Sequence, residues 1–214
     1  MSISLERIKT GLSFENYFAQ MKRRFEENAN QLLSDEESIN HHLVKLNISR
    51  VNRNLKQFSP SEKTQKIISS INQKQYWFIL SEDWCGDSAQ ILPIISQVAL
   101  LNPLISIHIF ERDSNLDLME KYLSDGKQSI PILAAFDETG NELFKWGSRP
   151  KIAVDLVSDL KSRGFSKEEF LENLHSWYAK NKGIEIENEI VSLITSAFQQ
   201  RAALLLESEL TFQQ

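Results

Sequence analysis

Apolar residues in the first quarter of the chain recur at spacings of three and four, the period of an amphipathic helix. Between 14 and 32 they form one stripe that contains Phe14, Tyr17, Phe18, Met21, Phe25, Ala29 and Leu32. Ser34, with Glu37 three residues later, matches a capping box and predicts the start of a second helical region. That region runs to Phe58, with a candidate break near Asn47.

The segment SPSE, residues 59–62, predicts the start of a third helix. Ser59 is the expected N-cap, Pro60 suits the first helical position and Glu62 completes the capping box. We expect this helix to end near Asn72.

The pattern then changes to short apolar runs that alternate with helical segments. QYWFILS, residues 75–81, is a continuous apolar run that is typical of a strand buried on both faces. Further strands are expected at 104–110, 130–136 and 141–147, and helices at 86–101, 115–126 and 149–164. The first two strands should be parallel, because a helix connects them, and the last two should form a hairpin. A four-stranded mixed sheet with helices on both faces is an α/β core.

The chain returns to helical patterns after Gly164. SKEE at 166–169 is another capping box, followed by apolar residues on one side of a helix: Phe170, Leu171, Leu174, Trp177 and Tyr178. After KGIEIEN, a last helix uses Ile190, Leu193, Ile194, Ala197, Phe198 and Leu204 or Leu205. We therefore expect a core at 60–164, a helical N-terminal extension at 1–59 and a helical C-terminal extension at 165–214, with both extensions packed on the core.

Composition limits the classes of function. The 214 residues suit one domain with extensions, or at most two domains, and 41% apolar with 25% charged residues is ordinary for a globular protein. A net charge of −5 argues against a nucleic-acid or anionic-membrane surface. The first residues contain no apolar run typical of a signal peptide, and no window approaches the about 18 apolar residues of a spanning helix. The single cysteine cannot form an internal disulfide, so a cytoplasmic location is expected.

That cysteine, Cys85, lies in the segment SEDWCGDSAQILP, between the predicted strand at 75–81 and the helix that follows. The unpaired N–H groups and the positive dipole end of a helix N-terminus favour a thiolate, which is the reactive form of cysteine. The carboxyl end of a strand in an open α/β sheet is also where ligands bind. Cys85 is therefore a candidate nucleophile, although a lone cysteine is commonly a buried packing residue.

WCGDS resembles the motif W-C-G-x-C of thioredoxin-like proteins, and WCGDS with WGSRP (146–150) is similar to a single-cysteine bacterial branch of that superfamily. Pro93 matches the proline inside the active-site helix, Pro131 after Ile130 matches the cis-proline that faces the thiol, and Gly147 matches the glycine of the adjacent loop. The resemblance covers about 60–164 and implies a thioredoxin-like fold.

This sequence departs from the thioredoxin pattern at several positions. Ser88 replaces the second cysteine, so an internal dithiol cycle is impossible, and Ile79 stands where thioredoxins have a buried Asp. Asp87 replaces the motif proline and, with Glu82 and Asp83, should disfavour a thiolate. Arg149 is expected to offset these charges or to hold a carboxylate-bearing ligand such as glutathione.

The leading functional hypothesis is a thiol-disulfide oxidoreductase that acts by a monothiol mechanism. Cys85 would attack a protein or low-molecular-weight disulfide, and a thiol from solution such as glutathione would resolve the mixed disulfide. Ser88 would donate a hydrogen bond to the thiolate. The backbone at Ile130 and Pro131 would align the partner, and Gly86 and Asp87 complete the motif.

Two alternatives remain open. One is a redox-inactive binding module that holds a protein or peptide in a groove flanked by Trp84, Pro131 and Trp146. The other is an iron–sulfur site with glutathione, as in monothiol glutaredoxins, which also use C-x-x-S. The sequence has no metal-ligand spacing and no phosphate loop, so neither a resident metal nor a bound cofactor is expected.

Overall fold

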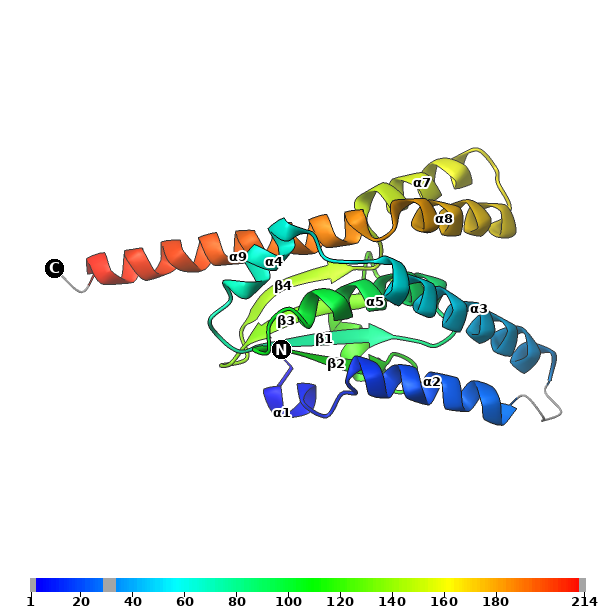
Figure 1. Cartoon of the computed structure of the whole chain (residues 1–214), viewed down its shortest axis with the longest axis horizontal. Coiled ribbons are helices and arrows are strands. Elements are labelled where there is room, and N and C mark those ends of the chain that lie inside the picture. Colours follow the sequence, from blue (N-terminus) through cyan, green and yellow to red (C-terminus); the bar gives the residue numbers. More distant parts are fainter. Residues whose placement is uncertain (1–2, 29–33, 212–214) are drawn as a thin grey trace.

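The computed structural model describes residues 3–28 and 34–211, and within these ranges four strands form one mixed sheet (Figure 1). The strands are β1 (Gln75–Ser81), β2 (Ile105–Glu111), β3 (Ile132–Asp137) and β4 (Glu142–Gly147). Their order is β2-β1-β3-β4; β2 is parallel to β1, whereas β3 is antiparallel to both β1 and β4. The predicted parallel pair, the predicted hairpin and the α/β class are confirmed.

Helices cover both faces of this sheet (Figure 1). They are α1 (Leu5–Ile8), α2 (Phe14–Asn28), α3 (Asp35–Gln57), α4 (Glu62–Ser69), α5 (Gly86–Ala99), α6 (Leu116–Met119), the 3₁₀ turn η1 (Glu120–Tyr122), α7 (Lys151–Ser162), α8 (Lys167–Asn181) and α9 (Ile184–Thr211). One buried apolar cluster joins the sheet to α2, α3, α5, α7, α8 and α9, and a second joins the opposite face to α1, α6 and η1. The larger cluster therefore includes helices from both ends of the chain.

The position of β1 inside the sheet explains why the middle of this strand is a continuous apolar run. Trp77 and Ile79 belong to the larger cluster, whereas Phe78 and Leu80 belong to the smaller one. Since side chains alternate between the two faces of a strand, a strand covered on both faces has no solvent-facing positions. Burial on both faces therefore accounts for the continuous apolar run in QYWFILS.

The two N-terminal helices follow the predicted pattern except at Asn47. Ser34 and Glu37 form the predicted capping box: the Ser34 N–H donates to the Glu37 carboxylate (2.8 Å), and the Glu37 N–H donates to Ser34 Oγ (3.3 Å). The expected break near Asn47 is wrong, since α3 is continuous. Asn47 is fully buried, and its Nδ2 donates to the backbone oxygen of Asp83 (2.7 Å). Ala29 and Leu32 of the predicted stripe lie outside the described residues.

The start of α4 also differs from the prediction. Ser61, not Ser59, is the N-cap, and its Oγ accepts from the N–H of Thr64 (3.2 Å). The N–H of Ser61 donates in turn to Glu187 of α9 (2.6 Å), a contact from far along the chain that fixes Ser61 as the cap. The helix ends at Ser69, before the predicted Asn72. Similarly, the helix expected at 115–126 is the short pair α6 and η1 and ends at Tyr122.

The C-terminal helices begin with the predicted capping box at Ser166 and Glu169. Helix α9 starts at Ile184, so the segment KGIEIEN, which we expected to precede the helix, is largely inside it. The far end of α9 projects beyond the rest of the molecule (Figure 1), and the side chains of Leu204 and Leu205 are outside the described part. Within the described residues, no helix is long and apolar enough to cross a membrane.

Candidate functional site

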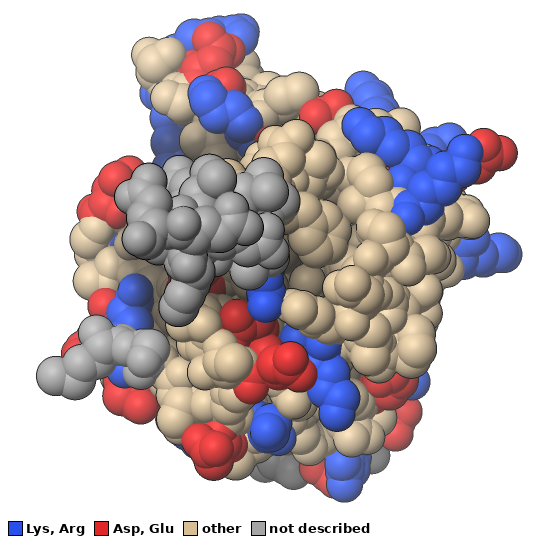
Figure 2. All heavy atoms as spheres, turned by 90° about the vertical axis from the view of Figure 1, so that its left-hand side faces the viewer, with Lys and Arg blue, Asp and Glu red and all other residues tan. Residues whose placement is uncertain are grey.

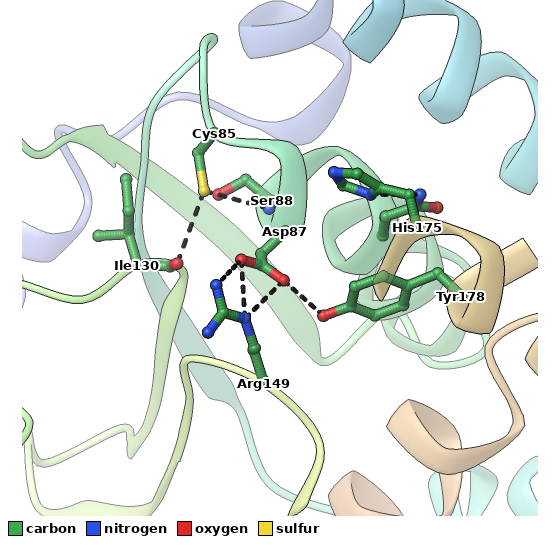
Figure 3. Close-up of polar contacts among 8 residues, drawn as sticks. Cys85, Asp87, Ser88, Ile130, Arg149, His175 and Tyr178 are labelled. Carbon is green, nitrogen blue, oxygen red and sulfur yellow. Dashed lines mark hydrogen bonds and ion pairs between the residues drawn. The ribbon is translucent and has the colours of Figure 1, made fainter. Parts of the chain in front are cut away.

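Cys85 follows β1 and is the N-cap of α5, the position predicted from the sequence (Figure 3). Its Sγ accepts a hydrogen bond from the N–H of Ser88 (3.4 Å) and donates one to the backbone oxygen of Ile130 (3.6 Å). The peptide bond between Ile130 and Pro131 is cis. The thiol, the helix terminus and the segment before Pro131 are therefore adjacent, whereas the buried hydroxyl of Ser88 has no hydrogen-bond partner among the residues that the structure describes.

The thiol is buried in the smaller apolar cluster, and the N-terminal helices of the same chain close one side of it. Cys85 is only 7% exposed, and the space beside it is a cavity of about 10 Å³. Side chains of α2 and α3 line one part of that cavity (Phe14, Tyr17, Phe18, Met21 and Val51), and the motif region with α5 lines the rest. About one water molecule fits in such a volume, and the low exposure of Cys85 leaves a disulfide substrate little access to Sγ in this conformation.

Burial, and secondly the negative charge of Asp87, raises the pKa of Cys85 to about 11. The side chain of Ser88 and, after it, the backbone N–H groups of Ser88 and Asp87 lower this pKa but are outweighed. Although the helix terminus favours a thiolate, the thiol is therefore protonated at neutral pH.

Asp87 is the centre of a buried polar cluster that joins three parts of the chain (Figure 3). Its carboxylate accepts from Nε of Arg149 (2.9 Å to each oxygen) and from Nη2 of the same residue (2.7 Å). The hydroxyl of Tyr178, on α8, donates to Oδ1 at 2.8 Å. Arg149 is thus turned toward Asp87 and is the partner of its charge.

Helix α8 also covers the glycine of the motif. A methyl group added to Gly86 would lie 2.8 Å from the ring of His175, so a side chain at this position would force that ring to move. His175 is held by a hydrogen bond between its Nδ1 and Nε2 of Gln90 (3.2 Å). Burial, followed by the positive charge of Arg50, lowers the pKa of His175 to about 4, so the ring is neutral at pH 7. It fills space rather than carrying charge.

The other two acidic residues of the motif region point to different partners. Asp83 is paired with Arg24 of α2 (3.0 Å from Nε), and the same guanidinium contacts Glu111 at 2.6 Å. Burial raises the pKa of Glu82 to about 7, although its Oε1 accepts from the N–H of Asp113 (2.7 Å). The pair between Arg24 and Asp83 fastens α2 beside the motif.

The two tryptophans expected to flank a groove are not neighbours. Trp84 is half-buried against the smaller apolar cluster, with the guanidinium of Arg112 4.9 Å from its ring centre. Trp146 is buried in the larger cluster, on the other face of the sheet, and its Nε1 donates to Glu189 of α9 (2.6 Å). Pro131 is buried as well. The structure therefore does not bring these three residues together at an open groove.

Sequence reasoning did not identify His175 and Tyr178 as part of this site. They are one turn apart on α8 and share a side of the helix. In the sequence Tyr178 is one of several apolar residues on one side of a helix, and an aromatic residue in such a stripe gives no sign of the polar group that its hydroxyl reaches. Among the described residues, no group of three or more His, Cys, Asp or Glu side chains is arranged to hold a metal ion.

Comparisons with known proteins agree with this architecture. A crystal structure of a protein of unknown function from Pseudomonas aeruginosa is 17% identical with a TM-score of 0.60, and the match covers 92% of this chain and 99% of that one. The structure of an HIV epitope-scaffold is 16% identical with a TM-score of 0.56, covering 91% and 99%. Both matches extend into the terminal helices and show a common fold. None of the curated proteins matches the chain.

The family model described as Thioredoxin matches residues 32–161, more than half of the sequence. The match includes β1, the helix α5 that follows Cys85, and the hairpin of β3 and β4. The chain therefore belongs to the thioredoxin family.

Proposed function

We propose that this thioredoxin-family protein is redox-inactive and acts by binding a protein or peptide partner. The observation that carries the proposal is the state of Cys85: it is buried, with α2 and α3 on one side of it, and its pKa is raised to about 11. Thiol–disulfide exchange requires a thiolate, and a pKa of 11 leaves about one thiol in ten thousand ionised at pH 7. The second position of the motif is Ser88, which cannot resolve a mixed disulfide.

The polar residues beside the thiol support the same conclusion. Asp87 is hydrogen-bonded to both Arg149 and Tyr178, so these groups connect the core to α8 and are not free to bind a substrate. The motif then stabilises the fold instead of performing chemistry.

Helix α3 offers a surface for a partner. Ile39 is 62% exposed and Leu46 is 39% exposed, and they lie two turns apart on the outer side of the helix. Exposed apolar side chains on one face of a helix are typical of contact sites for an apolar surface of another protein. We therefore place the partner on the outer side of α3, away from the sealed thiol.

Two measurements on the intact protein test the inactivity. The rate of Cys85 alkylation by iodoacetamide, followed from pH 5 to 10, should be slow at pH 7 and should show no midpoint below the ordinary thiol value. Glutathione-coupled disulfide reduction by the wild type should equal that by the Cys85→Ser variant. Turnover clearly above that of the Cys85→Ser variant would contradict the proposal.

A monothiol oxidoreductase is the second candidate, and the position of Cys85 as the N-cap of α5 favours it. In that function α2 and α3 would move away, Cys85 would attack a disulfide, and glutathione would resolve the mixed disulfide. Arg24 fastens α2 to Asp83 and Glu111, so the Arg24→Gln variant should loosen this cover. Arg23→Gln is the matched control, because Arg23 is exposed on the same helix.

The two variants separate the candidates. If opening activates the thiol, Arg24→Gln gains disulfide-reduction activity that Arg23→Gln lacks. If the protein is redox-inactive, Arg24→Gln exposes the thiol to alkylation without gaining turnover.

A further inference from the structure

A second cavity lies at the opposite end of the sheet from Cys85. Its volume is about 240 Å³, and most of its wall is apolar, with Ile71, Leu143, Phe144, Ile194, Ala197 and Phe198. Gln75 also lines it and begins β1, whereas Cys85 follows the end of that strand. Since a strand rises about 3.3 Å per residue, the cavity is about 20 Å from the thiol. Figure 2 looks onto this end, where uncharged surface lies beside side chains of both signs.

The acidic residue in the wall of this cavity already has its hydrogen bonds. Oδ1 of Asp137 accepts from the N–H and hydroxyl of Thr139 (2.9 and 2.7 Å) and from the N–H of Asn141 (3.0 Å). Burial alone would raise the pKa of Asp137, but these hydrogen bonds outweigh it and lower the pKa. Asp137 is therefore a satisfied anion that needs no further donor.

The hydrogen-bond donors in the wall of the cavity have fewer partners than Asp137 has. Arg201, whose side chain is 42% exposed, reaches Oδ2 of Asp137 only at 3.9 Å. Lys74 is an exposed cation in the same wall. Oε1 of Gln75 accepts from the indole N–H of Trp77 (3.0 Å), which leaves its amide N–H₂ as the donor of this side chain. The wall of this apolar cavity thus carries two cations and an amide, whereas its acidic residue, Asp137, already has its hydrogen-bond donors. This set of groups complements a ligand with an anionic group.

We propose that this cavity binds a small carboxylic acid with an apolar body. An apolar cavity of about 150 Å³ holds benzene, so 240 Å³ accommodates about ten non-hydrogen atoms. The apolar body lies against Phe144, Ile194 and Phe198, and the carboxylate faces Arg201. The proposal does not depend on the state of Cys85.

Isothermal titration of the full chain with octanoate tests the proposal, with 1-octanol as the uncharged analogue. Octanoate should bind at least tenfold more tightly than 1-octanol, and the Arg201→Gln variant should lose most of this difference. Ala197→Phe, which fills the cavity, should abolish binding of both compounds. Arg163→Gln is the matched control, because Arg163 follows the end of α7, pairs with Asp159 and is absent from the cavity wall.

Two results would overturn the proposal: no octanoate binding to the wild type, or binding that Ala197→Phe leaves unchanged. The melting temperature of each variant without ligand shows whether it is folded. If Ala197→Phe is unfolded, the smaller substitution Ala197→Leu takes its place with the same expected loss.

Discussion

Replacing Arg149 by Gln should destabilise the protein more than any exposed arginine replacement, because it leaves a buried charge without its main partner. The side chain of Asp87 is 10% exposed and that of Arg149 is 26% exposed. In the variant, Asp87 keeps the hydroxyl of Tyr178 as its side-chain donor but loses the bidentate guanidinium. The buried carboxylate of Asp87 would then have no positive charge to balance it.

The magnitude follows from the burial of the pair. Removing one partner of a buried ion pair costs about 3–5 kcal/mol. Arg149 retains some contact with water, so we expect the lower end, about 3 kcal/mol. Asp87→Asn should cost less, about 1–2 kcal/mol, because Arg149 is more exposed than Asp87 and solvent can reach its charge. The double variant should be more stable than the sum of the two single changes predicts, by about 2 kcal/mol.

Urea unfolding at pH 7, followed by tryptophan fluorescence, measures these differences. Arg163→Gln is a suitable control, because its pair with Asp159 is exposed and should contribute at most about 0.5 kcal/mol. If Arg149→Gln is no more destabilising than this control, or if the two single changes are additive, the ion pair does not stabilise the fold as described.

Three further predictions concern neighbouring residues. The folded-state pKa of Glu82 is raised to about 7. The contribution of Glu82 to the free energy of unfolding is therefore complete below its unfolded pKa and is lost as the pH rises through 7. Glu82→Gln should raise the melting temperature at pH 8 but not at pH 4. Gly86→Ala should destabilise the protein by about 1–3 kcal/mol in urea unfolding, and His175→Ala in the same chain should recover part of this loss; a full loss in the double variant would contradict the contact. Asp87→Asn should lower the pKa of Cys85 only in part, because burial is the larger cause, so a midpoint of alkylation at the ordinary thiol value would refute that order.

The features that could be predicted from the sequence are those whose partners are close along the chain. The capping boxes at Ser34 and Ser166 lie within four-residue windows, and both are present. The N-cap residue of α4 is also bound by Glu187, and the side chain of Asn47 within α3 is bound by the carbonyl of Asp83. Those contacts join distant segments, so the local pattern gave the wrong start for one helix and an unnecessary break in the other.

The candidate site shows the same division. The position of Cys85 between a strand and a helix could be predicted, because it follows from two adjacent periodic segments. Its burial could not, because the apolar stripe of the first helix indicates that the helix packs but not which surface it covers. Asp87 was expected to disfavour a thiolate, which agrees with the raised pKa of Cys85, whereas its bond to Tyr178 joins residues 91 positions apart and left no trace in the local pattern.

The bond between Asp87 and Tyr178 also bears on how the chain folds during synthesis. Proteins emerge from the ribosome N-terminus first, and their domains begin to fold in that order. Here the hydrogen bond from Tyr178 to Asp87 of the motif can form only when α8 has emerged. The hydrogen bond from the N–H of Ser61 at the start of α4 likewise needs Glu187 of α9. A nascent chain that ends before residue 167 has its whole sheet but an unfinished interior. We therefore expect the native state of this protein to be reached late in translation, with the C-terminal helices closing a core that formed before them.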